Sequence, residues 1–160
     1  MKIIIIAAVS GNNVIGREGT IPWHSKEELS YFKEATYGFP VIMGKNTFLS
    51  IGKPLTGRLN IIITSNPQLF IKFEDIKCFF NLKEALFFCE NNYFERVFIA
   101  GGAKLYSEAI EKADEMIISR MNFDVEGDTF FPYIDPEIWD KTKGEKYNEF
   151  ETYIYTKKVK

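Results

Sequence analysis

The stretch KIIIIAAV, residues 2–9, determines the class of fold that the rest of the chain completes. Lys2 is its only polar residue, and every residue after it is apolar. Such an unbroken run is typical of a strand buried on both faces, whereas a strand with one solvent-exposed face alternates apolar and polar residues. Burial on both faces requires a covering layer on each side. The stretch therefore predicts an α/β fold with a mainly parallel sheet flanked by helices.

The same run is also near the minimum length for a secretory signal peptide. Its four consecutive isoleucines and the turn-like GNN at 11–13 favour a strand instead.

Cys78 and Cys89 form no C-x-x-C pair. Free thiols in a cytoplasmic protein are therefore the expectation, and a structural disulfide is the alternative. No segment approaches the roughly 20 apolar residues of a membrane span.

Further apolar runs alternate with segments of helical pattern. Buried strands are expected at 40–44, 59–65 and 96–102. Helices are expected at 25–37, directly after Gly44, at 81–92 and at 103–113. This alternation is the pattern of a parallel sheet with helices on both faces.

The last third of the chain follows a different pattern. A strand is expected at 114–123, and two alternating segments near 139–147 and 150–158 predict a solvent-facing antiparallel pair. Loops are expected at 10–24, 52–57, 66–76 and 124–129. No Pro/Ser-rich linker and no internal repeat divides the sequence, so a single domain over 1–160 is expected.

Composition limits the classes of partner. The 160 residues are 46% hydrophobic and 16% aromatic, and their net charge is −2. This charge argues against nucleic acid or an anionic membrane as a partner. The single histidine, His24, cannot supply a histidine-rich site, so no metal is expected.

The segment IPWHSKEELSYFKEAT, residues 21–36, places one carboxylate among apolar residues. Stepping about 100° per residue puts Glu28 on the apolar face with Leu29, and Glu27 on the polar face that meets water. One interpretation is a capping box, in which the Glu28 side chain returns to the Ser25 N–H. The other is a carboxylate in an apolar cleft, with a raised pKa, that pairs with two adjacent N–H donors or delivers a proton.

Glycines end two of the expected strands. Gly44 and the pair Gly101–Gly102 each stand between an apolar run and a helix, although neither belongs to a P-loop or to G-x-G-x-x-G. A helix N-terminus offers free N–H groups that suit a phosphate, and open α/β sheets bind ligands where their strands end. Two such sites favour a nucleotide, and plain turn chemistry is the alternative for each.

Three weaker signals lie nearby. The hydroxyls of Thr64 and Ser65 suit an extra phosphate, although the following Asn-Pro alone explains a turn. The planar fork of Arg58 suits a carboxylate, and a solvated surface arginine is the alternative. The Gly- and Asn-rich loop 10–24 is either a mobile connection or a functional lid.

Four motifs together resemble the dihydrofolate reductase family. They are IGREGTIPWHSKEELSYFK, PVIMGKNTFLSIGKPLTGRLNIIITS, FIAGGAKLY and EGDTFFP, in that family's order and spacing. The resemblance covers most of the chain and is weakest at 66–95 and after 135. It implies a central eight-stranded sheet flanked by about four helices. It also implies NADPH-dependent reduction of 7,8-dihydrofolate to tetrahydrofolate.

The resemblance implies a substrate site in which Glu28 holds N3 and the 2-amino group of the pterin. Arg58 would clamp the α-carboxylate of the glutamate tail. The other substrate-binding positions that it implies are Ala8, Trp23, Leu29, Phe32, Ser50, Ile51 and Leu55. The residues that it implies for the catalytic centre are Glu28, Ile21, Trp23, Tyr106 and Ser119.

The resemblance implies three groups of NADPH contacts. The nicotinamide and its ribose would meet Ala7, Ile15, Gly16, Gly19, Thr20 and Tyr106. The pyrophosphate, adenosine ribose and 2′-phosphate would meet Gly44, Lys45, Asn46, Thr47, Thr64, Ser65 and Asn66. A second phosphate loop would comprise Ala100, Gly101, Gly102, Ala103, Lys104 and Leu105, with a cis peptide at Gly-Gly.

Four positions depart from common versions of the family pattern. Glu28 stands in place of Asp, Lys45 in place of Arg, Ile21 in place of Met or Leu, and Ala100 in place of a larger residue. The expected partners are dihydrofolate and antifolate inhibitors, bound by a monomer.

Two alternative functions remain. A pyrimidine reductase of riboflavin synthesis shares the fold and the cofactor, but the P-W…E-L…F signature speaks against it. A non-catalytic nucleotide- or folate-binding module is disfavoured because both Glu28 and the phosphate loops are retained.

Overall fold

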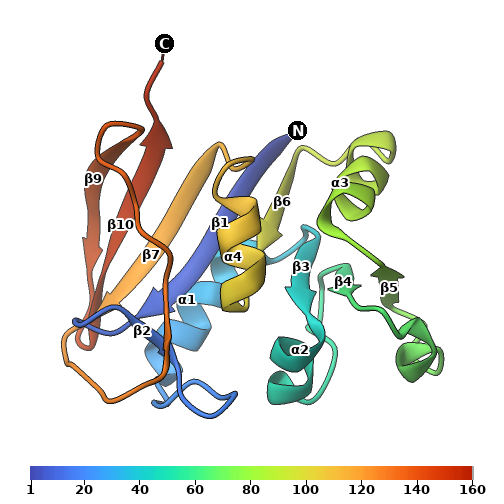
Figure 1. Ribbon diagram of the computed structural model, residues 1–160, viewed down its shortest axis with the longest axis horizontal. Helices are drawn as coiled ribbons and strands as arrows, with labels where there is room; N and C mark the ends of the chain where they lie inside the picture. The colour runs from blue at the N-terminus through green and yellow to red at the C-terminus, as the bar shows by residue number, and fades with distance from the viewer. Residues whose placement is uncertain (160) are drawn as a thin grey trace.

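β1 (Lys2–Val9) lies inside an eight-stranded sheet, as its apolar run predicts (Figure 1). The structure is a computed structural model that describes residues 1–159. The other strands of this sheet are β3 (Val41–Gly44), β4 (Asn60–Ile63), β5 (Ile76–Phe79), β6 (Arg96–Ile99), β7 (Glu115–Met121), β9 (Trp139–Lys146) and β10 (Phe150–Lys157). The helices are α1 (Lys26–Thr36), α2 (Lys45–Ile51), α3 (Leu82–Asn91) and α4 (Ala103–Ala109), and a 3₁₀ turn, η1, spans Pro67–Phe70.

The strand order is β5-β4-β3-β6-β1-β7-β10-β9. All pairs from β5 through β7 are parallel, and β10 is antiparallel to both β7 and β9. The expected mainly parallel sheet with an antiparallel C-terminal hairpin and four helices is confirmed.

Successive residues of β1 face two separate cores. Ile5, Ala7 and Val9 pack with side chains of α3 and α4, whereas Ile4 and Ile6 pack with those of α1 and α2. Figure 1 shows the corresponding layers, with α4 in front of the sheet and α1 behind it. Each isoleucine buried in this way stabilises the fold by roughly 2 kcal/mol.

Three elements differ from the sequence prediction. β5 lies at the edge of the sheet and is only partly buried, so it carries no continuous apolar run that would predict it. The expected loops 10–24 and 124–129 contribute β2 (Val14–Gly16) and β8 (Thr129–Phe130), which pair with each other. They are too short to show a local periodicity.

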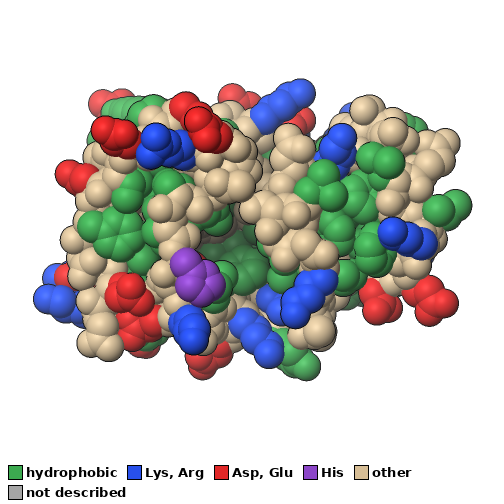
Figure 2. Space-filling view, turned by 90° about the horizontal axis from the view of Figure 1, so that it is seen from below, with side chains coloured by type: hydrophobic (Ala, Val, Ile, Leu, Met, Phe, Trp, Pro, Cys, Tyr) green, Lys and Arg blue, Asp and Glu red, His purple; other side chains and the backbone are tan. Residues whose placement is uncertain are grey.

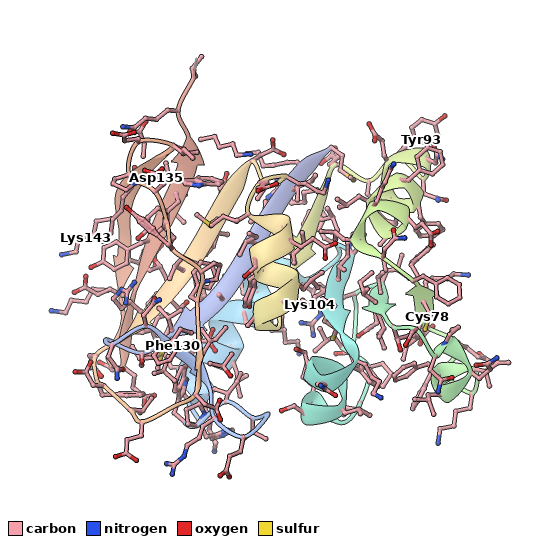
Figure 3. The ribbon with its side chains drawn as sticks, in the orientation of Figure 1. Cys78, Tyr93, Lys104, Phe130, Asp135 and Lys143 are labelled. Atoms are coloured by element: carbon pink, nitrogen blue, oxygen red, sulfur yellow. The ribbon has the colours of Figure 1, made fainter. Side chains whose placement is uncertain are left out.

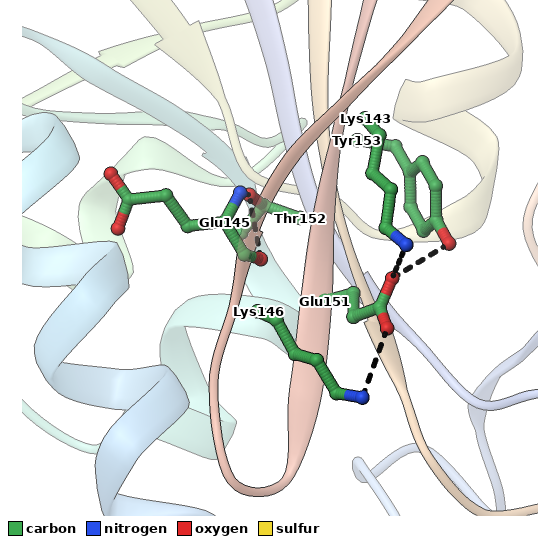
Figure 4. Close-up of polar contacts among 6 residues, drawn as sticks. All are labelled: Lys143, Glu145, Lys146, Glu151, Thr152 and Tyr153. Carbon is green, nitrogen blue, oxygen red and sulfur yellow. Dashed lines mark hydrogen bonds and ion pairs between the residues drawn. The ribbon is translucent and has the colours of Figure 1, made fainter.

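β9 also lacks the predicted alternation, because every residue after Trp139 is exposed. It is the opposite edge of the sheet, and charged side chains protect such an edge from pairing with other chains. Lys143 and Lys146 lie 3.4 and 3.9 Å from the carboxylate of Glu151, which also accepts a hydrogen bond from Tyr153 (Figure 4).

Among residues 1–159, no helix is long and apolar enough to cross a membrane.

Candidate active site

The parallel strands end along one edge of the sheet, which is the lower edge in Figure 1. Figure 2 looks at this edge and shows a hollow with an apolar floor, flanked by the chain's single histidine and by several basic side chains. That histidine is His24, which directly precedes Ser25, the N-cap of α1. The first turn of α1 therefore lies at the hollow.

Glu28 brings an unpaired carboxylate to this turn. The Ser25 hydroxyl caps the helix by accepting the Glu28 N–H at 3.2 Å. The Glu28 side chain, in contrast, makes no hydrogen bond within residues 1–159, so the reciprocal half of the capping box is not formed. Burial raises the pKa of Glu28 to about 7, because an apolar environment disfavours the charged form.

The apolar face of α1 is more open than the sequence predicts. Leu29 is 49% exposed, Phe32 and Ala35 are partly buried, and only Thr36 is fully buried. The periodicity identifies an apolar face correctly, but cannot distinguish a packed core from the wall of a cleft. Glu27 corrects a second prediction, since its carboxylate does not simply face water but accepts hydrogen bonds from the β9–β10 turn.

Ala8 and Ser119 lie side by side on β1 and β7. Ser119 is 1% exposed, and its hydroxyl is a buried group without a hydrogen-bond partner in the described chain. Buried hydroxyls are normally paired, so this one is free to bond a ligand or a water. Ala8 is partly buried beside it.

Tyr106 is a buried residue of α4. Its hydroxyl donates to the Ile6 carbonyl at 2.8 Å, and its ring lies 5.0 Å from that of Phe131. Burial, and then the charge of Glu28, raise the pKa of Tyr106. Tyr106 is therefore close enough to Glu28 to be affected by its charge.

The two glycine turns meet directly. The Gly44 N–H donates to the Gly101 carbonyl at 2.8 Å, and the peptide between Gly101 and Gly102 is cis, as the family resemblance implies. α2 begins at Lys45 and α4 at Ala103, and neither helix has a side-chain cap. Their first N–H groups are thus available to a ligand.

The side chains around these turns are mostly accessible. Lys104 is exposed and lies at the lower end of α4 (Figure 3). Ala100, Lys45, Thr47, Gly102 and Ala103 are partly buried, Asn46 is exposed, and Leu105 is buried. Leu105 belongs to the core on this face of the sheet, so it supports the loop from behind.

We expect Gly101→Ala to weaken both stability and NADPH binding. Gly101 has φ +105°, and a Cβ there would lie 3.1 Å from the Tyr106 ring. An alanine in this backbone conformation costs about 2 kcal/mol. The measurements are denaturant unfolding and the KM for NADPH. Gly102→Ala is the matched control, because its Cβ would meet only the Thr47 hydroxyl, at 3.6 Å. Equal stability losses in the two variants would contradict this reasoning.

The residues that follow β4 differ in exposure and in what they can bind. Thr64 is buried, and its hydroxyl accepts the Asn66 N–H at 3.1 Å, so it shapes the turn. Ser65 and Asn66 are exposed. Of the two predicted hydroxyls, only that of Ser65 is therefore open to a phosphate.

Arg58 lies against the far end of α1. Its Nε donates to the Thr56 carbonyl at 2.9 Å, its Nη1 donates to the Thr36 hydroxyl at 3.2 Å, and its guanidinium lies 5.8 Å from the centre of the Phe32 ring. Nη2 makes no hydrogen bond within residues 1–159. Part of the planar fork therefore remains available for a carboxylate.

Sequence reasoning missed Asn60, which holds the loop before Arg58. Asn60 is fully buried, and its amide exchanges hydrogen bonds with both the N–H and the carbonyl of Leu55 and donates to the Arg58 carbonyl. The available signal was an amide at the start of the apolar run NIII. Leu55 is partly buried, whereas Ser50 and Ile51 are exposed at the end of α2.

The loop 10–24 is anchored at its middle. The Asp128 carboxylate accepts the Glu18 N–H at 2.9 Å, and the Asp128 N–H donates to the Gly16 carbonyl at 3.1 Å. Ile15 and Trp23 are partly buried, whereas Gly19, Thr20 and Ile21 are exposed. Trp23 meets the Phe123 ring edge-on at 5.8 Å. Sequence reasoning also missed Asp128, whose partners lie about 110 residues away.

A family model described as dihydrofolate reductase matches residues 2–159 of the chain. The chain belongs to the dihydrofolate reductase family. It is 37% identical to the dihydrofolate reductase of Bacillus subtilis (strain 168) over 163 residues, which cover 98% of this chain and 95% of the relative. It is 41% identical to dihydrofolate reductase type 3 of Salmonella typhimurium over 132 residues, or 82% and 79% of the two chains.

The fold agrees with a solved dihydrofolate reductase. The structure of the Enterococcus faecalis enzyme, complexed with NADP(H) and RAB-propyl, superimposes with a TM-score of 0.85 at 30% identity. The match covers 99% of this chain and 97% of that one. The chain is thus an NADPH-dependent oxidoreductase of the dihydrofolate reductase family, and neither the pyrimidine reductase nor the binding-module alternative is favoured.

Proposed function

We propose that Glu28 anchors the pterin of dihydrofolate in the hollow. The observation that carries this proposal is the partly buried carboxylate with a pKa of about 7 and no hydrogen-bond partner in residues 1–159. A pterin presents two adjacent N–H donors, at N3 and the 2-amino group, which match the two oxygens of a carboxylate. Binding would replace the hydrogen bonds that burial removes and lower the pKa of Glu28 again.

Ser119 and Tyr106 complete this end of the site. The orphan hydroxyl of Ser119 can share a water or a pterin N–H with Glu28. The charge of Glu28 favours protonation of pterin N5, with a water as the carrier. The Tyr106 hydroxyl is already committed to the Ile6 carbonyl, so Tyr106 serves as a wall of the nicotinamide pocket.

The glycine turns fit NADPH. The uncapped first turns of α2 and α4 offer N–H groups to the pyrophosphate, and Lys45 and Lys104 supply positive charge beside them. The exposed Ser65 hydroxyl suits the 2′-phosphate. NADPH supplies the hydride for pterin C6 when it is bound. Ala7 and the segment 15–20 would border the nicotinamide, and this segment would act as a lid that excludes water.

The remaining predicted residues form the substrate walls. The apolar side chains that surround the pterin and the aminobenzoyl group would be those of Ala8, Ile21, Trp23, Leu29, Phe32, Ile51 and Leu55. Exposed leucine and isoleucine at a cleft gain stability when a flat aromatic ligand covers them. Ser50 would border the aminobenzoyl group.

Arg58→Leu should weaken binding of dihydrofolate through its glutamate tail. A hydrogen-bonded charge pair contributes enough that the KM for dihydrofolate should rise about tenfold. The KM for NADPH should not change. The control substrate is a dihydropterin without the glutamate, for which the variant and the wild type should differ little. A similar loss with this truncated substrate would refute the proposed contact between Arg58 and the α-carboxylate.

One assay tests the function as a whole. Purified protein is mixed with NADPH, and the loss of NADPH absorbance is followed after addition of dihydrofolate. Turnover should stop when methotrexate is added in stoichiometric amount, which also tests the proposed binding of antifolate inhibitors. Binding without turnover would instead support a non-catalytic module.

We further propose that the chain acts as a single-domain monomer in the cytoplasm. Glu28, Arg58 and both glycine turns come from one chain, so the site requires no second copy. Light scattering at assay concentration tests this, and a dimer mass would refute it.

A further inference from the structure

The first turn of α1 is fastened to the turn between β9 and β10. The Glu27 carboxylate accepts the Glu149 N–H at 3.1 Å and the Asn148 side-chain N–H at 3.3 Å. The Ser25 hydroxyl donates to the Glu149 carboxylate at 2.9 Å. We call these residues, Ser25, Glu27, Asn148 and Glu149, the clamp.

The clamp is connected to the backbone of Glu28. The Ser25 hydroxyl gives its single hydrogen to Glu149 and accepts the Glu28 N–H with a lone pair. Ser25 is 4% exposed, so water does not compete freely for these bonds. The β9–β10 turn is therefore connected to Glu28 in two ways. It bonds the Ser25 hydroxyl that caps the Glu28 N–H, and it bonds the carboxylate of the adjacent residue, Glu27.

The β9–β10 turn is itself held from the other side. The N–H and the side-chain amide of Asn122 donate to the carbonyls of Glu149 and Asn148, both at 3.0 Å. Tyr31 of α1 packs edge-on against Tyr147 and Phe150, with ring centres 5.6 and 5.9 Å apart. Asn122 directly follows β7, the strand that carries Ser119. The clamp therefore joins the element of Glu28 to the element of Ser119.

We propose that Glu27 is a positioning residue for the reaction. By holding the β9–β10 turn against α1, it sets where the Glu28 carboxylate stands relative to β7 and Ser119. The inference rests on the proposed role of Glu28. A single short helix is marginally stable, and its first turn frays without such ties. A reacting group must nevertheless be held to within a fraction of an ångström.

The positioning role of Glu27 depends on its hydrogen bonds and not on its negative charge. In the structure the Glu27 carboxylate serves as an acceptor for two N–H donors of the β9–β10 turn. Removal of the Glu27 charge should therefore matter little as long as an acceptor oxygen remains. Glu27→Gln keeps such an oxygen for the Glu149 N–H, whereas Glu27→Ala removes it.

The test measures kcat and KM separately for both substrates in Glu27→Ala, Glu27→Gln and Glu34→Ala. Glu34 is the matched control, because it is an exposed glutamate on the same helix without a side-chain hydrogen bond in the described residues. We expect Glu27→Ala to lower kcat/KM for dihydrofolate about tenfold and to leave the KM for NADPH unchanged. Glu27→Gln should restore most of the loss, and Glu34→Ala should behave as wild type.

A second arm combines Glu27→Ala with Glu28→Gln. If Glu27 acts through Glu28, the double variant should be no slower than Glu28→Gln alone. A further loss of similar size in the double variant would overturn the proposal, and so would an effect of Glu27→Ala no larger than that of Glu34→Ala. Wild-type turnover by Glu28→Gln alone would instead overturn the role of Glu28 on which the inference rests.

Glu149→Ala provides an independent measurement if Glu27→Ala does not fold. It removes the acceptor of the Ser25 hydroxyl from the opposite side of the clamp. The same selective fall of kcat/KM for dihydrofolate, with an unchanged KM for NADPH, is expected. Unchanged constants in this folded variant would count against the clamp.

Discussion

Glu28→Gln is expected to lower kcat/KM for dihydrofolate about 100-fold at neutral pH while the fold is retained. The amide keeps one acceptor oxygen but has no negative charge, so it neither pairs with both pterin donors nor favours a proton at N5. Burial already gives Glu28 a pKa of about 7 in the empty site. Two N–H donors of the pterin should lower this pKa and keep the carboxylate ionised during turnover.

The loss should shrink toward acid pH. Below the pKa of Glu28 in the complex, the wild-type carboxyl is itself neutral and resembles the amide of the variant. Solvent also becomes a better source of the N5 proton. The measurement is kcat/KM from about pH 5 to about pH 9, with the exposed Glu34→Gln as control. Wild-type rate at neutral pH, or a loss that does not depend on pH, would exclude the proposed role.

The same substitution should stabilise the ligand-free protein at alkaline pH. The folded pKa of Glu28 is about 7, against an ordinary value of 4.5, so the folded state binds this proton more tightly than the unfolded state does. The stability that comes from neutral Glu28 is complete below 4.5 and is lost as pH rises through about 7. A glutamine stays neutral throughout. Glu28→Gln should therefore gain about 2–3 kcal/mol relative to wild type near pH 8, and nothing near pH 4.5.

Denaturant unfolding at these two pH values, without ligands, measures the difference. Glu34→Gln should show no comparable pH-dependent gain, because Glu34 is exposed. A Glu28→Gln variant less stable than wild type at pH 8 would mean that the carboxylate makes a favourable contact in the empty protein. Saturation with dihydrofolate should reverse the order, since the substrate stabilises the wild type more. Together the two measurements identify a group that weakens the fold in order to serve the site.

Most of the secondary structure could be predicted from the sequence, because its signals are local. The apolar runs of β1, β3, β4 and β6 and the helical periodicity of α1 and α3 each lie within about ten neighbouring residues. β5 could not be predicted, because an edge strand that is only partly buried needs no continuous apolar run. β9 is also an edge strand, so it does not need the predicted alternation of buried and exposed residues.

The candidate site could be predicted only in part. The apolar environment of Glu28 follows from its angular position on α1, and the glycine turns follow from where the strands end. The exposure of Leu29 does not follow, because the same apolar face can border either a core or a cleft. The functions of Thr64 and Asn60 were likewise open, since a hydroxyl or an amide shows its partner only after the turn has closed.

By itself the sequence determined the order of the buried strands β1, β3, β4 and β6 and of the four helices, the apolar setting of Glu28 and membership of the family. Tertiary structure alone decided which groups were left without partners and which were tied down. The Ser119 hydroxyl is buried on a strand between β1 and β10 without a partner in the described residues, and Glu27 differs from a solvated glutamate because Glu149, 122 residues later, folds against it. Contacts of such separation leave no mark in local periodicity, because they depend on chain segments that meet only when the whole sheet has formed.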